Sequence, residues 1–323
     1  NNTAVGATSL QTVDGIQNTA VGSSALAADC LNNNVAVGYQ AGLVNTGADN
    51  TIVGSEAGKA FTGSNATIVG AGAADVAVSQ TNLTAVGMGA LGAATSGNNC
   101  TAVGKNALGT TVDGAFNTAV GTGALAADCG NDNTAVGSGV LDVFTGSNAT
   151  AIGSGAAEVA TSATFLTAVG KSALGALTIG LSNTAVGHKA LTTNLTTGDY
   201  DTAVGDTAGQ DVYGDHNTLV GFQAGQYASD VDHCIAIGSS ALRGPASFTD
   251  ATCDTHSNQT VDCNTSSTIA VGQYVTGSGI PAETIVIAVN TPGAVTQFTI
   301  GFSATSSLTD TTLTFWSNTG DYN

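Results

Sequence analysis

The stretch Asn18-Thr19-Ala20-Val21-Gly22-Ser23-Ser24-Ala25-Leu26 is written again, almost unchanged, at residues 117–125 and 183–191. Its central triplet, AVG or a close variant, occurs fifteen times, and successive glycines are 16 or 17 residues apart with one spacing of 18. A fixed period of this length is the signature of stacked repeats. The fifteen repeat glycines are Gly6, Gly22, Gly38, Gly54, Gly70, Gly87, Gly104, Gly121, Gly137, Gly153, Gly170, Gly187, Gly205, Gly221 and Gly238.

Each repeat carries a strand-like core beside its glycine, which we count as position 0. Position −1 is Val in thirteen repeats and Ile in two, position −2 is Ala in twelve, and position −3 is Thr in thirteen. Val and Thr favour strands, and so short a period has no room for two packed helices. We therefore predict an all-β fold over residues 1–243: a parallel β-solenoid (β-roll) of about 15 coils, with two short strands and two turns per coil. At about 4.8 Å per coil the rod would be roughly 70 Å long.

The alternation within the strand predicts which side chains lie inside. Positions −2 and 0 share one face, and positions −3 and −1 share the other. Ala and Gly suit the close opposite wall of a thin coil, so we expect Val and Thr outside, where a long apolar column implies a partner surface. The inverse assignment, with Val inside, would suit a monomeric rod. The position −1 column is Val5, Val21, Val37, Val53, Val69, Val86, Val103, Val120, Val136, Ile152, Val169, Val186, Val204, Val220 and Ile237.

Two further positions have predicted structural roles. Asn occupies position −4 in eight repeats and is expected in a turn, where its side chain tolerates a left-handed backbone and bonds neighbouring coils. The repeat glycine is expected at a corner where φ is positive or a Cβ would collide.

The repeat ends near Arg243, and residues 244–323 are predicted to form a small antiparallel β module. This module would cap the solenoid, assemble copies or contact a target. Cys253 and Cys263 lie ten residues apart in it and are a candidate disulfide. The first repeat begins at residue 1, without Met, so we expect a processed product or a fragment, in which head-to-tail contacts could build a filament.

The composition restricts partners and location. The net charge is −18, with only five basic residues, which disfavours binding to nucleic acid or to anionic membranes. No apolar run is long enough to span a membrane as a helix, so no membrane insertion is expected. Acidity and a candidate disulfide favour an extracellular or virion setting.

The NTAVGxxAL unit resembles the head repeats of trimeric autotransporter adhesins and, more closely, NTAVGYQAL-type arrays in phage tail fibres. Asn33-Asn34-Val35-Ala36-Val37-Gly38-Tyr39-Gln40-Ala41-Gly42 is nearly a copy of the latter. The resemblance covers residues 1–243 and implies a left-handed parallel β-roll in which three chains pack around one axis. The neck, stalk and barrel of adhesins and the self-cleaving chaperone domain of many phage fibres are not found in this sequence.

No catalytic or cofactor constellation is recognised. His188, His216, His233 and His256 are scattered and are expected to be solvated surface residues rather than catalytic ones, so we expect no enzyme and no cofactor. Loop carboxylates could bind Ca²⁺ but more often serve as turn residues; these are Asp29, Asp128, Asp211, Asp215, Asp230 and Asp232. Candidate N-glycosylation sequons begin at Asn1, Asn65, Asn82, Asn99, Asn148, Asn194, Asn258 and Asn264.

These observations favour a structural, non-enzymatic subunit of an extracellular or virion fibre that serves adhesion. The expected partner is a copy of the chain itself, as a homotrimer or a head-to-tail filament. The alternative is a receptor-binding fibre protein whose C-terminal module binds a host glycan or protein. A minor alternative is an ice-binding solenoid that uses the Thr column.

Overall fold

A computed structural model describes residues 1–12, 14–192, 198–228, 232–242, 247–255, 259–263, 274–278, 280–281, 285–291, 296–301, 303–305 and 308–316. The chain divides into two compact units, Asn1–Ala241 and Leu242–Asn323. The sequence had suggested a boundary after residue 243.

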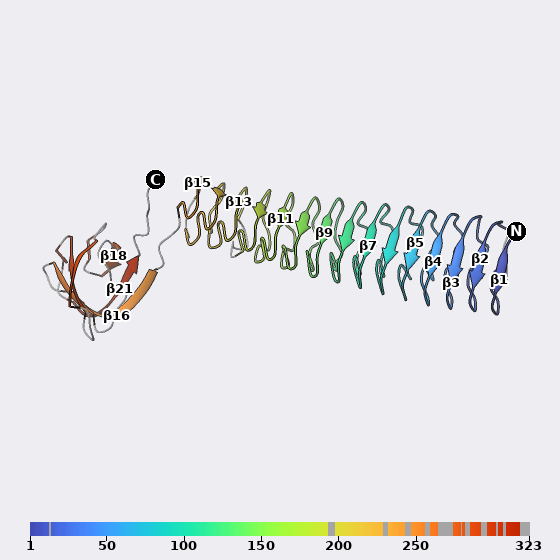
Figure 1. Cartoon of the computed structure of the whole chain (residues 1–323), viewed down its shortest axis with the longest axis horizontal. Helices are drawn as coiled ribbons and strands as arrows, with labels where there is room; N and C mark the ends of the chain where they lie inside the picture. The colour runs from blue at the N-terminus through green and yellow to red at the C-terminus, as the bar shows by residue number, and fades with distance from the viewer. Residues whose placement is uncertain are drawn as a thin grey trace. The chain divides into compact units, whose positions relative to one another are not determined.

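The first unit is a parallel β-solenoid with one short strand in each coil. Fifteen strands pair in chain order into one sheet, which Figure 1 shows as a row of arrows from β1 to β15. Equivalent residues face each other; Thr3, for example, pairs with Thr19. The strands are β1 Thr3–Val5, β2 Thr19–Val21, β3 Val35–Val37, β4 Thr51–Val53, β5 Thr67–Val69, β6 Thr84–Val86, β7 Thr101–Val103, β8 Thr118–Val120, β9 Thr134–Val136, β10 Thr150–Ile152, β11 Thr167–Val169, β12 Thr184–Val186, β13 Thr202–Val204, β14 Thr218–Val220 and β15 Ile235–Ile237.

The predicted second strand of each coil is wrong for the described residues. In the turn that begins at the glycine, φ is positive at positions 0, +2 and +4, as at Gly22, Ser24 and Leu26. The Ser24 N–H donates to the Ala7 carbonyl of the preceding coil, and the Leu26 N–H donates to the Ala41 carbonyl of the following coil. The turn therefore satisfies its backbone through contacts between coils, which offset the cost of a left-handed backbone.

The core of the solenoid is thin and is built largely from alanine. Ala20 at position −2 and Ala25 at position +3 are fully buried, as is Leu26. The larger fully buried side chains include Phe61, Phe144, Ile52 and Ile68. So narrow an interior can hold two facing layers only if a large residue in one layer meets a small residue in the other.

The repeat glycines stack directly on one another. Gly121 has φ +133, and a Cβ there would overlap the backbone carbonyl of Gly137 in the next coil. Both predicted reasons for the glycine, a positive φ and a collision, are confirmed.

Asparagine at position −4 forms an internal ladder. The Asn34 Oδ1 accepts the Asn50 backbone N–H at 3.1 Å, and its Nδ2 donates to the Gly47 carbonyl at 2.9 Å. Asn34 is fully buried, so it replaces water as the partner of these backbone groups. The predicted bonding between coils is confirmed. The predicted left-handed backbone is instead found one residue earlier, at position −5, for example Asn33 with φ 62°.

The second unit contains the predicted antiparallel sheet, in the order β18-β21-β16-β17-β20-β19. Cys253 and Cys263 are paired in the backbone register of β16 and β17, and the candidate disulfide stays a prediction. The strands are β16 Ser247–Thr255, β17 Thr260–Cys263, β18 Tyr274–Gly277, β19 Val286–Thr291, β20 Thr296–Ile300 and β21 Leu308–Trp316.

Candidate association surface

The outer face of the solenoid sheet carries the Thr and Val columns. In β2, Ala20 is fully buried, whereas Val21 is 37% exposed. Ile152 of β10 is 40% exposed, and Ile235 and Ile237 of β15 are 75% and 69% exposed. The predicted assignment, with small residues inside and Val outside, is confirmed. We call positions −3 and −1 of β1 to β15 the Thr/Val stripe.

The Thr/Val stripe is free of charge along its whole length. No Asp, Glu, Lys or Arg occupies either position in any of the fifteen coils, although the chain carries a net charge of −18. In the described residues, no stripe threonine uses its hydroxyl in a side-chain hydrogen bond within the chain. Methyl groups and unengaged hydroxyls therefore alternate across the face, a surface that another molecule can cover without burying a charge.

One edge of the stripe is lined by position −5, where an aromatic column runs through the last coils. The Tyr200 and His216 ring centroids are 4.9 Å apart, and those of His216 and His233 are 4.8 Å apart with an interplanar angle of 2°. Sequence reasoning treated these histidines as scattered. The repeat numbering predicts their proximity, because Tyr200, His216 and His233 each lie five residues before a repeat glycine.

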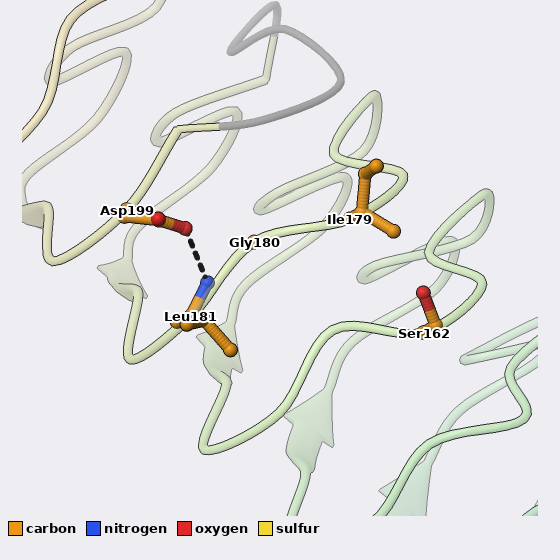
Figure 2. A pocket seen from close by; sticks show the side chains of 5 residues that line it. All are labelled: Ser162, Ile179, Gly180, Leu181 and Asp199. Atoms are coloured by element: carbon orange, nitrogen blue, oxygen red, sulfur yellow. Dashed lines mark hydrogen bonds between the residues drawn. The ribbon is translucent and has the colours of Figure 1, made fainter.

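The loop carboxylates accept backbone hydrogen bonds between coils. The Leu181 N–H donates to Asp199 Oδ1 at 2.7 Å, beside a shallow hollow of about 280 Å³ (Figure 2). The Asp199 and Asp215 N–H groups donate likewise to Asp215 and Asp232.

Four of the six carboxylates considered for Ca²⁺ have this role: Asp215 and Asp232, together with Asp29, which accepts the Asp14 N–H, and Asp128, which accepts the Val112 N–H. Asp230 lies outside the described residues, and Asp211 has an interaction of its own. Within the described part of the chain, no three His, Cys, Asp or Glu side chains are grouped to hold a metal ion. No cluster of the described side chains therefore supports Ca²⁺ binding.

Five of the candidate sequons share position −5: the exposed Asn1 and four further asparagines. Asn65, Asn82, Asn99 and Asn148 are exposed at position −5 with φ near 60°, and Asn82 Nδ2 donates to Asn99 Oδ1 at 3.0 Å. The sequon pattern follows from the fold, because position −3 is the stripe threonine. Asn194, Asn258 and Asn264 lie outside the described residues. Glycosylation stays a prediction.

The other titratable groups considered are His188 and three buried thiols, and His256 is outside the described residues. His188 Nδ1 lies 3.2 Å from Asp206 Oδ2 on the exposed surface. Burial raises the pKa of the Cys30, Cys100 and Cys129 thiols, which keeps them protonated and unreactive.

The comparisons with known proteins add no relative: no family model, curated protein or solved structure matches the chain. No helix in the described residues is long and apolar enough to cross a membrane.

Proposed function

We propose that this chain is the rod-forming, non-enzymatic subunit of an extracellular or virion fibre that serves adhesion, and that copies associate along the Thr/Val stripe. The observation that carries the proposal is the absence of charge from the stripe in all fifteen coils of an acidic chain. A solvated face would have no reason to exclude charged residues so consistently.

The dimensions of the stripe support this role. Fifteen rungs at about 4.8 Å, with outward residues about 7 Å apart, give roughly 500 Å² of uncharged surface. This equals the largest apolar patches of ordinary monomers, and it continues through all fifteen paired strands. A stable interface buries about 800 Å² per partner, so residues that flank the stripe, such as those at position +1, would take part.

Stiffness is the second requirement of a fibre. The backbone bonds of the sheet, the turn and the Asn34-type ladder all run along the rod axis, from coil to coil. Each added coil extends the rod without enlarging its cross-section, so length is obtained by repetition.

A matched pair of variants tests the proposal. Ile152 and Val159 belong to the same coil and are 40% and 39% exposed, but only Ile152 lies in the stripe. Ile152→Asp would bury a charge between copies and should dissociate them, whereas Val159→Asp should leave the mass of the assembly unchanged. Light scattering after size-exclusion chromatography measures the mass of both variants, and circular dichroism confirms that they are folded. Equal masses for the two variants and the unsubstituted protein would refute association through the stripe.

A further inference from the structure

The column at position −5 brings together two imidazoles that are 17 residues apart in the sequence. His216 and His233 each lie two residues before a strand, and the register of β14 and β15 pairs Thr218 with Ile235. The two histidines therefore occupy the same position on neighbouring rungs. The separation of their ring centroids, 4.8 Å, is the rung spacing itself.

Both imidazole rings are exposed on the surface. In the described part of the chain, neither imidazole forms a side-chain hydrogen bond or an ion pair, and their described contacts are ring stacking. His188 differs on both counts: its Nδ1 lies 3.2 Å from Asp206, and it has no described imidazole neighbour.

We propose that His216 and His233 form a two-imidazole site for a borderline divalent cation such as Zn²⁺, Ni²⁺ or Cu²⁺. Neutral imidazole is a preferred ligand of these ions, in contrast to Mg²⁺ and Ca²⁺, which take oxygen ligands. Metal–nitrogen bonds of about 2.0–2.1 Å place two ligating nitrogens about 3–4 Å apart. The rings therefore tilt toward each other from their parallel arrangement, a movement that exposed side chains can make.

The surroundings favour a cation at this place. Asp215 and Asp232 directly precede the two histidines, and each has its Oδ1 held by a backbone N–H of the preceding coil. The two carboxylates are thus held in place one residue from the histidines. They do not join the imidazoles in a described group of three or more ligands. Water fills the remaining coordination positions, so the site is open and exchangeable.

Calorimetric titration of the full chain, without a polyhistidine tag, with Zn²⁺ or Ni²⁺ tests the site. One ion per chain should bind, and His216→Ala or His233→Ala should weaken binding by at least about tenfold, the loss seen even for outer ligand partners. His188→Ala is the matched control and should bind as the unsubstituted protein does. Ca²⁺ should show no binding at this site. Undiminished affinity in the His216→Ala/His233→Ala double variant, or equal binding of Ca²⁺, would overturn the proposal.

A second measurement does not depend on the folding of variants. In the unsubstituted protein, substoichiometric Cu²⁺ should broaden the imidazole proton resonances of two of the four histidines. Broadening of all four alike, or of none, would contradict a paired site.

Discussion

The δ1 carbon of Ile52 lies 3.0 Å from the point that a Cβ on Gly42 would occupy. The same relation recurs wherever position −2 is large, because glycine then holds position +4 of the facing turn. In most other coils Ala at position −2 faces Leu at position +4, with Ala74 and Ala157 as the exceptions at +4, so the two layers share one fixed volume. The other glycines in this relation are Gly58 against Ile52 and Ile68, and Gly209 and Gly225 against Leu219.

Gly42→Leu combined with Ile52→Ala should be less damaging than the sum of the single changes. Leucine tolerates the left-handed backbone at position +4, as Leu91 shows with φ 52°. Gly42→Leu alone overpacks the core, and Ile52→Ala alone leaves a cavity that costs about 2–5 kcal/mol. Urea unfolding of the four proteins of the cycle measures the coupling. Strict additivity would mean that the volumes are not shared.

Gly121→Ala and Gly123→Ala should differ sharply although they lie in one coil. A Cβ on Gly121 overlaps the Gly137 carbonyl, whereas the nearest atom to a Cβ on Gly123 is an Asp142 oxygen at 3.6 Å. We expect a loss of about 1 kcal/mol for Gly123→Ala, from its left-handed φ, and at least about 3 kcal/mol for Gly121→Ala. Residue-resolved hydrogen exchange measures the effect and shows where the coil opens. Equal protection of the β8 and β9 amides in the two variants would contradict the prediction.

Gln80→Ala should not destabilise the protein, although Gln80 is fully buried. Neither polar atom of its side chain has a partner in the described part of the chain. The stretch 61–67 recurs at 144–150, and the residue that corresponds to Gln80 after the second copy is Ala163. Burying an unpaired amide costs about 1–3 kcal/mol, which offsets the packing that Gln80 provides. The reciprocal change, Ala163→Gln, should lower the unfolding free energy by about this amount. Thermal melts of both variants check the prediction, and a large loss in Gln80→Ala would show that its amide is satisfied.

The free energy of unfolding should fall as the solution becomes alkaline. Burial raises the pKa of the Cys30, Cys100 and Cys129 thiols, so the folded state holds protons that the unfolded state releases above about pH 8.5. Stability from these groups is complete below that pH and is lost as the pH rises toward the folded pKa. Urea unfolding at about pH 7 and pH 9.5 measures the decline. The triple Cys→Ala variant should decline less, and an identical slope would assign the effect to other groups.

Much of the solenoid could be predicted because its period makes each residue a member of a column. The strand, the buried Ala20 column and the glycine corner follow from alternation and from the small size of the residues. The rest of the coil could not be predicted from propensity. Left-handed Leu26 or Phe116 is unfavourable alone and is tolerated because neighbouring coils bond its backbone, which is a tertiary effect.

The same reasoning explains what was missed at the edge of the stripe. The alignment of Tyr200, His216 and His233 follows from their spacing of 16 and 17 residues, which matches the repeat period rather than a catalytic motif. In a solenoid the informative neighbour of a residue is the one a full period away, not the one beside it in the chain.

The mass of the full chain under native conditions tests the central claim most directly. A subunit of 31.3 kDa that associates through an uncharged stripe should sediment as a multiple of that mass. The assembly should become tighter as salt screens the −18 charge of each copy. A stable species of 31.3 kDa at all concentrations and salt levels would contradict the account.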